Sequence, residues 1–318
     1  MNTGKLLIST ASWEPRFLAG VRRILDQEQV AGALCFWFSE YGTRTAEARE
    51  EFAKLLSPRP THFIELPMYL TESRLGGHSI PAYVVVWREI NKAIMEWMGN
   101  YGSFILDITT MPREAMWMAL DLLTEAAIAG KLVYHRAAEH GDWCGAEPEQ
   151  PHIVPKLGGL PALNLPTRLM IVSGYDEDRS EQFIGSYEPC ETVILFQEFV
   201  SGTHEENREK NEMRHRRRFG DRGRAIRFKG VNCYGPDWGF AQILAEAREF
   251  GKCSNLILAS LGPKTSAISV YRVLRSLPEA CLIYAPCRSY NLEYSKGIGE
   301  TLALDWPRAD QLMGAPAL

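Results

Sequence analysis

The sequence predicts an α/β protein with two tandem Rossmann-like lobes, each a parallel sheet with flanking helices, related by a pseudo-twofold axis. In residues 104–123, an apolar strand meets Asp107, a polar turn and then a helix with apolar residues at helical spacing. In residues 256–275, a strand, a Gly-Pro-Lys turn and a helix follow in the same order. Strands that alternate with helices in this way indicate parallel sheets built from βαβ units.

The remaining elements also occur twice in the same order. Each predicted strand of the first half has an equivalent in the second half: 5–9 and the strand opening 168–183, 33–38 and 192–199, 61–67 and 225–231, and 131–137 and 280–286. The amphipathic helix 82–98 is equivalent to 237–251. Residues 145–167 are rich in proline and glycine, which predicts a linker without regular elements. The predicted lobes therefore span 1–144 and 168–318. Residues 68–81 are predicted to form a loop.

Composition is that of an ordinary globular protein, with 46% hydrophobic and 23% charged residues among 318. The net charge of −4 gives no general reason to expect nucleic acid as a partner. Seven cysteines without C-x-x-C spacing favour reduced thiols. Since neither a signal peptide nor an apolar run of about 18 residues is visible, we expect a cytoplasmic protein without a membrane partner.

The two repeated turns are the first candidate ligand site. Parallel sheets bind ligands at the carboxyl ends of their strands, and helix N-termini attract phosphate. The candidate ligand-binding residues there are Asp107, Thr109, Thr110 and Arg113 in the first turn, and Ser260, Gly262, Lys264 and Thr265 in the second. The alternative is that Asp107 and Ser260 only cap helices.

Two further groups of residues are expected at the same edges. The turns that follow the first strand of each half offer Ser12 with Arg16, and Tyr175 with Arg179. The segment 288–302 offers two tyrosines that can stack on bases and a glycine-rich stretch that can accept phosphate, with candidate residues Arg288, Tyr290, Tyr294, Ser295 and Lys296. The alternative for this segment is a structural turn.

The stretch from Asp107 to Arg113, D-I-T-T-M-P-R, resembles the pattern [DN]-x-[ST]-x-x-x-[RK] that follows the fourth strand of CRISPR-associated Rossmann-fold sensor domains, the CARF family. Two such units in one chain also resemble SAVED domains. The resemblance implies a cleft between the lobes that binds a cyclic oligonucleotide, and a sensory or regulatory role in antiviral defence. The second turn, Ser260 to Lys264, is two residues shorter and lacks the acid, so an asymmetric site is expected.

Several alternatives to a pure sensor remain open. Some CARF relatives cleave their ligand without metal, which makes Thr109, Thr110, Lys264 and Ser266 candidate catalytic residues. The sequence shows no effector segment, so a separate effector protein is expected as partner. No cofactor or metal is expected, because the common phosphate-loop, dinucleotide and zinc patterns are missing. The basic segment 208–229 either contacts protein, DNA or RNA, or forms a solvated face balanced by glutamates.

Overall fold

The computed structural model describes residues 4–67, 73–75, 78–141, 143–198, 205–220 and 225–308. The chain divides into unit 1, Met1–Glu139 with Ser295–Leu318, and unit 2, His140–Tyr294. These bounds differ from the predicted lobes, because the C-terminal strand belongs to unit 1 and the expected linker 145–167 belongs to unit 2. Within the described part of the chain, no helix is both long enough and apolar enough to cross a bilayer.

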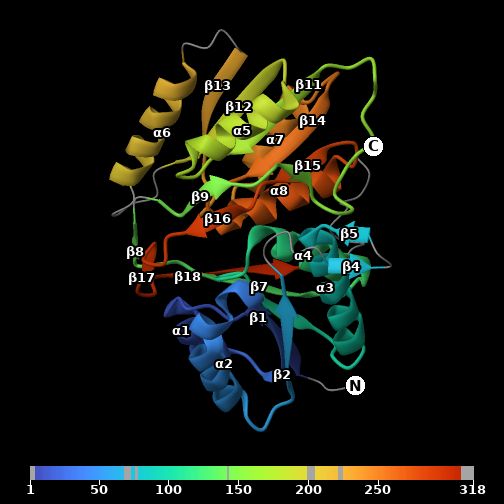
Figure 1. Cartoon of the computed structure of the whole chain (residues 1–318), viewed down its shortest axis with the longest axis vertical. Helices are drawn as coiled ribbons and strands as arrows, with labels where there is room; N and C mark the ends of the chain where they lie inside the picture. The colour runs from blue at the N-terminus through green and yellow to red at the C-terminus, as the bar shows by residue number, and fades with distance from the viewer. Residues whose placement is uncertain are drawn as a thin grey trace. The chain divides into compact units, whose positions relative to one another are not determined.

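Unit 1 contains a six-stranded sheet in the order β18-β7-β6-β1-β2-β3. Its elements are β1 (Lys5–Thr10), α1 (Arg16–Gln27), β2 (Val30–Phe38), η1 (Ser39–Tyr41), α2 (Gly42–Leu56), β3 (Thr61–Leu66), α3 (Ala82–Met98), β6 (Phe104–Asp107), α4 (Arg113–Glu125), β7 (Gly130–His135) and β18 (Thr301–Trp306). Five strands are parallel, and β18 joins the edge antiparallel to β7. Figure 1 shows this red C-terminal strand among the blue and green elements of unit 1.

Unit 2 repeats this sheet in the order β10-β15-β14-β11-β12-β13. Its elements are β10 (His152–Ile153), β11 (Thr167–Val172), α5 (Glu177–Tyr187), β12 (Glu191–Gln197), α6 (Glu205–Phe219), β13 (Ala225–Val231), α7 (Phe240–Phe250), β14 (Asn255–Ser260), α8 (Lys264–Ser276) and β15 (Cys281–Tyr284). Again five strands are parallel, and the added edge strand, β10, runs antiparallel to β15. The predicted α/β class and the repeat of two Rossmann-like units are therefore confirmed, whereas the pseudo-twofold axis stays a prediction.

Each sheet is covered by helices on both faces. In unit 1 the side chains of α1 and α2, such as Phe17 and Phe52, share one core with Leu7 and Ile105 of the sheet. Helices α3 and α4 pack against each other as a second pair, and α7 with α8 forms the matching pair in unit 2. Because both faces of each sheet are buried, the central strands consist of continuous runs of apolar residues.

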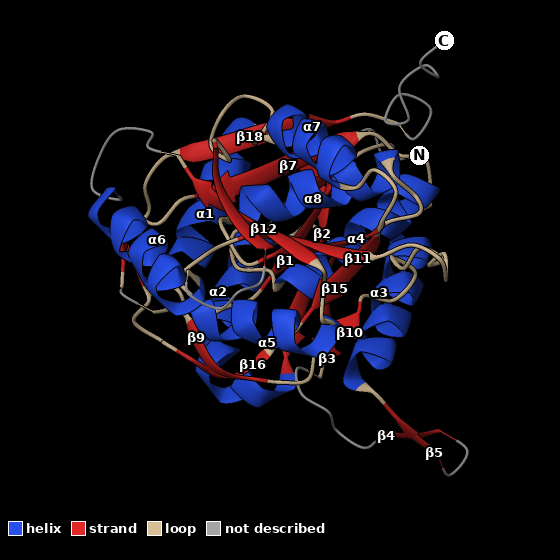
Figure 2. Ribbon diagram, turned by 90° about the horizontal axis from the view of Figure 1, so that it is seen from above, coloured by secondary structure: helices blue, strands red, loops and turns tan. Residues whose placement is uncertain are grey.

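Two predictions about loops are corrected. The segment 145–167 contains β9 (Gly145–Pro148), which pairs antiparallel with β16 (Cys287–Tyr290), and also the edge strand β10. Prolines are tolerated there because short edge strands leave N–H groups outside the ladder. Within 68–81, β4 (Ser73–Leu75) pairs with β5 (His78–Ile80), and Figure 2 shows this pair projecting beyond α3. Residues 68–72 and 76–77 lie outside the described residues. The short strands β8 (Glu139–His140) and β17 (Ser295–Lys296) lie where the chain passes between the units.

The C-terminal strand is expected to be required for the stability of unit 1. Trp306 is 1% exposed and lies opposite Gly130 of β7. Truncating such a side chain leaves a cavity, so Trp306→Ala should cost about 3–5 kcal/mol in urea unfolding. Hydrogen exchange should accelerate in β7 and stay unchanged in β14. The matched control is Asp305→Ala, an exposed change on the same strand; equal loss in both variants would contradict the expectation.

Candidate functional site

The two predicted turns lie at corresponding places in the two sheets. Strands β6 and β14 end at Asp107 and Ser260, and the helices α4 and α8 begin at Arg113 and Lys264. Each helix is preceded by a proline of nearly the same conformation, with φ −57° and ψ 144° at Pro112 and φ −55° and ψ 151° in unit 2. In each unit a cationic residue therefore opens a helix whose first N–H groups have no partner within the helix.

Asp107 organises the turn of unit 1. The register of β1 with β6 places Ser9 beside Asp107, and the Ser9 hydroxyl donates to one carboxylate oxygen at 3.2 Å. The other oxygen accepts the Thr109 N–H at 3.0 Å, and the Thr109 hydroxyl oxygen accepts the His135 N–H at 3.0 Å. Asp107 is 0% exposed, so its carboxylate holds the turn. It does not cap α4, because Pro112 occupies that position.

The turn of unit 2 is held by hydroxyls instead. The Ser266 hydroxyl donates to the Pro263 carbonyl at 2.7 Å and lies 2.9 Å from the Ser260 hydroxyl. Gly262 is required by the neighbouring backbone, since a Cβ there would lie 2.8 Å from the Ser173 carbonyl oxygen. In unit 1 the Thr110 hydroxyl similarly donates to a backbone carbonyl, that of Thr10, at 2.7 Å. Three of the four candidate catalytic side chains, those of Thr109, Thr110 and Ser266, therefore make hydrogen bonds within their own unit.

Two threonine hydroxyls at these edges have no hydrogen-bond partner among the described residues. Thr265, in the first turn of α8, is 0% exposed, and Thr10, at the end of β1, is 2% exposed. A buried hydroxyl without a partner costs about 1–3 kcal/mol. Such groups need an explanation, and an ordered water, an ion or a polar group of a ligand can supply the partner.

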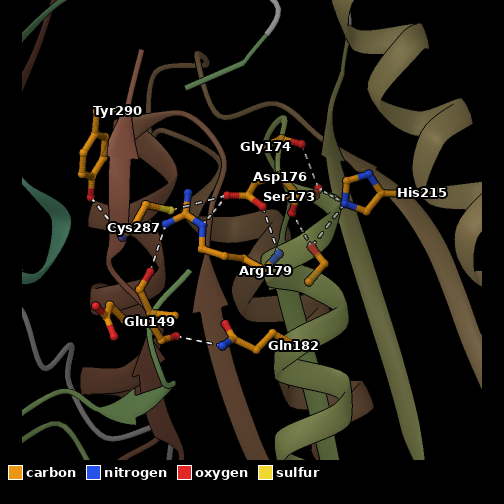
Figure 3. Close-up of polar contacts among 11 residues, drawn as sticks. Glu149, Ser173, Gly174, Asp176, Arg179, Gln182, His215, Cys287 and Tyr290 are labelled. Carbon is orange, nitrogen blue, oxygen red and sulfur yellow. Dashed lines mark hydrogen bonds and ion pairs between the residues drawn. The ribbon is translucent and has the colours of Figure 1, made fainter. Parts of the chain in front are cut away.

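In each unit a buried arginine makes an ion pair and a hydrogen bond at the turn that follows the first strand, β1 or β11. We call this pair of contacts the arginine clamp. The Arg179 Nε donates to Asp176 at 2.5 Å, and an Nη donates to the Ala285 carbonyl, just beyond β15, at 3.1 Å. Figure 3 shows the Arg179 guanidinium beside the Asp176 carboxylate. In unit 1, Arg16 donates to Glu14 at 2.7 Å and to the carbonyl of His135, the last residue of β7, at 3.3 Å.

The predicted ligand-binding roles of Arg16 and Arg179 are not supported by these contacts, since both guanidinium groups are buried against the protein itself. Although burial alone lowers the pKa of each guanidinium, the adjacent Glu14 or Asp176 carboxylate raises it above the ordinary arginine value. Both side chains therefore stay charged and paired. Ser12 also serves its turn, because its hydroxyl oxygen accepts the Glu14 N–H at 3.2 Å.

Unit 2 carries a buried polar centre that the sequence did not single out. The Nε2 of His215 on α6 lies 2.9 Å from the Ser173 hydroxyl and 3.2 Å from the Ser180 hydroxyl (Figure 3). Burial lowers the pKa of this imidazole. The available signal was the spacing of Asn211, His215 and Phe219, which form a buried stripe on an otherwise charged helix.

The predicted tail site is divided between the two units. Residues up to Tyr294 lie in unit 2, whereas Ser295 and Lys296 belong to unit 1, where the Ser295 hydroxyl donates to Glu14. The Tyr290 hydroxyl oxygen accepts the Cys287 N–H at 3.3 Å, and burial raises its pKa well above the ordinary value.

The remaining tail candidates lie against unit 2. Arg288 pairs with Glu149 at 2.5 Å. The Tyr294 ring lies 5.1 Å from that of His140 and 6.2 Å from that of Tyr175. The two tyrosine rings are therefore packed against each other, with the His140 ring beside Tyr294.

The basic segment 208–229 is largely balanced by acids. Its ion pairs among the described residues join Arg216 to Glu212, Arg218 to Asp178 and Glu181, Arg227 to Glu191, and Lys229 to Glu246. Residues 221–224, with Arg222 and Arg224, lie outside the described residues. These pairs support the interpretation of a solvated face.

Among the residues that the structure describes, no group of three His, Cys, Asp or Glu side chains is placed to hold a metal ion. No family model matches the chain, and no curated protein matches it in sequence. Among solved structures, the chain is similar to a type III CRISPR defence DNA nuclease activated by cyclic oligoadenylate, at 10% identity and a TM-score of 0.47 over 85% of this chain, and it spans 64% of that protein's length. It is also similar to CobK precorrin-6A reductase, at 13% identity and a TM-score of 0.23 over 88% of this chain and 87% of that one.

We expect the arginine clamp to stabilise unit 2 strongly. Removing one partner of a buried ion pair leaves the other charge uncompensated, here that of Asp176. Arg179→Ala should therefore lower the free energy of unfolding in urea by about 3–5 kcal/mol. The control is Arg288→Ala, which removes an exposed ion pair and should have little effect. Equal stability of the two variants would contradict the clamp.

His135 is expected to make unit 1 sensitive to acid. Its ring is 0% exposed, with Nδ1 2.8 Å from the Thr301 hydroxyl. Burial lowers its pKa, with Arg23 and Arg16 acting in the same direction and the Asp107 carboxylate opposing them. Since the unfolded chain takes up the proton more readily, stability is greatest above the ordinary histidine pKa of about 6.5 and falls as the pH drops below it.

The measurement is urea unfolding at several pH values from about 7.5 to 5.5. His135→Gln should flatten the pH dependence. Thr301→Val removes the hydrogen bond between His135 and Thr301 but keeps the imidazole. It should therefore lower the free energy of unfolding without changing how that free energy depends on pH. A wild-type slope in His135→Gln would assign the acid sensitivity to other groups.

Proposed function

We propose that this protein binds a phosphate-rich nucleotide signal, of the cyclic oligonucleotide class, at the carboxyl edges of its two sheets. It would serve as the sensory or regulatory component of an antiviral defence system and pass the signal to a separate effector protein. The observation that carries the proposal is the buried, unpartnered hydroxyl of Thr265 in the first turn of α8, one residue after Lys264.

The chemistry of the two turns supports an anionic ligand. The positive ends of the α4 and α8 dipoles favour phosphate, and each helix start carries a cationic side chain. Arg113 offers a planar fork for two phosphate oxygens, whereas Lys264 offers a point charge, so the two turns would contact phosphate in different ways.

The hydrogen bonds of the turns support binding more than cleavage. The hydroxyls of Thr110 and Ser266 each donate to a backbone carbonyl, and that of Thr109 accepts a backbone N–H. Groups held in this way order the turn around a ligand without activating it. A sensor would release its ligand intact, and chromatography of a ligand incubated with the protein tests this point.

Calorimetry with a panel of cyclic and linear oligonucleotides tests the proposal. Losing a charged hydrogen bond costs about 1.5–3 kcal/mol, so Lys264→Ala and Arg113→Ala should each weaken binding about tenfold or more. Thr265→Val removes only the unpartnered hydroxyl. It should weaken binding while leaving the free protein as stable as before or more so, because the buried polar group is gone.

The matched control for Thr265→Val is Thr192→Val, another buried threonine, on β12. It should leave affinity unchanged. Lack of binding to every member of the panel, or binding that survives both Lys264→Ala and Arg113→Ala, would refute the proposal.

A further inference from the structure

Helix α6 is attached to unit 2 through a polar anchor. Among its described side chains, Asn211, His215 and Phe219 are buried, and His215 is 0% exposed. The imidazole also lies against aromatic rings, 5.3 Å from Phe196 of β12 and 5.8 Å from Phe219. A buried imidazole in the middle of such a stripe is costly unless its hydrogen bonds are satisfied.

The hydrogen bonds of His215 fix its tautomer. Nδ1 lies 3.0 Å from the Asn211 carbonyl oxygen, which can only accept, so Nδ1 carries the proton and Nε2 is an acceptor. Nε2 faces the hydroxyls of Ser173 and Ser180. The single Ser173 hydroxyl proton has two acceptors within reach, Nε2 at 2.9 Å and the Gly174 carbonyl at 3.2 Å. The Ser180 hydroxyl has a similar choice, between Nε2 and the Asp176 carbonyl. Protonation of Nε2 would remove the shared acceptor and leave both hydroxyls with their backbone acceptors.

Ser173 also touches the turn that opens α8. The N–H groups of Leu261 and Gly262 both donate to the Val172 carbonyl, at 2.7 and 2.9 Å. A Cβ at Gly262 would lie 2.8 Å from the Ser173 carbonyl oxygen, and one at Gly174 would lie 2.0 Å from the Leu261 carbonyl oxygen. The two turns are therefore in close backbone contact, so a shift of the Ser173–Gly174 backbone toward the α8 turn would have to displace Leu261 and Gly262.

We infer that His215 is a positioning residue for ligand binding at the α8 turn, acting through Ser173. Neutral His215 accepts the Ser173 proton and holds the Ser173–Gly174 backbone against Gly262. The start of α8 is thereby kept in its binding conformation. The inference rests on the proposed function, and it adds that affinity at this turn depends on the protonation of a histidine on α6.

The charges around His215 define the direction of the effect. Asp176 and Glu177 at the start of α5 favour the charged imidazole, whereas burial and Arg218 on α6 disfavour it. The uncharged neighbours are Ser173, which directly follows β11, and Phe196 of β12. The imidazole is neutral at neutral pH; acidification places a proton on Nε2 and removes the acceptor that Ser173 uses.

The test is calorimetric titration with cyclic tetraadenylate from about pH 7.5 to about pH 5.5, a range in which its phosphodiesters and bases do not titrate. Because burial lowers the pKa of His215, wild-type affinity should be greatest at about pH 7.5 and should fall toward the acidic end of this range. His215→Phe fits the aromatic surroundings and should bind about fivefold more weakly at every pH. His215→Gln keeps an acceptor that does not titrate, so it should retain affinity within about twofold and lose the pH dependence.

Met213→Ala, an exposed change on the same helix, should leave both affinity and pH profile unchanged. Wild-type affinity in His215→Phe, or a wild-type pH profile in His215→Gln, would overturn the positioning role while leaving the binding function intact. If cyclic tetraadenylate does not bind, the same variants are titrated with the panel member that binds most tightly; lack of binding to every member would refute the inference together with the function that it rests on.

Discussion

The arginine–carboxylate clamp is the interaction on which the carboxyl edge of each unit depends. In the strand orders β7-β6-β1 and β15-β14-β11, the middle strand carries the candidate ligand turn. Arg16, at the start of α1 after β1, donates to the carbonyl of the last residue of β7. Arg179, in the first turn of α5 after β11, donates to the carbonyl just beyond β15. The clamp therefore joins the two strand ends that flank each candidate turn. A buried guanidinium is tolerated there because a carboxylate and a carbonyl replace its water.

The two units share this framework and differ in the chemistry that they build on it. The turn between β6 and α4 in unit 1 is ordered by the buried Asp107 carboxylate. The turn between β14 and α8 in unit 2 is ordered by hydroxyls and by the packing of Gly262 against the turn after β11. The His215 centre with its two serine hydroxyls belongs to unit 2. The same framework therefore carries a turn of different chemistry in each unit.

The unpartnered threonine hydroxyls connect the fold to the proposed ligand. Proteins satisfy nearly all their buried polar groups, and Thr10 and Thr265 are exceptions at the edge where parallel sheets bind ligands. Valine would have nearly the same shape without the cost of an unpaired hydroxyl. Retaining the hydroxyl therefore lowers the stability of the free protein, and under the proposed function it would supply a donor and an acceptor to the ligand.

The sequence by itself determined the α/β class, the repeated order of elements and the positions of Arg113 and Lys264 at the starts of two helices. These features depend on local patterns: apolar periodicity identifies strands and helices, and a proline fixes where each helix begins. Such signals involve residues that are close together in the chain, so they can be recognised without knowledge of the tertiary structure.

Only the tertiary structure decided the roles of the other polar residues and the bounds of the units. From the sequence, Arg16 and Arg179 are predicted to be loop cations that bind a ligand. In the structure both are buried, and each donates to a carbonyl more than 100 positions away in sequence. The edge strand β18 joins β7 across a similar separation, and His215 meets Ser173 only when α6 packs beside β11. The physical reason is the same in each case: a hydrogen bond or strand pair between distant segments leaves no periodic trace in either segment alone.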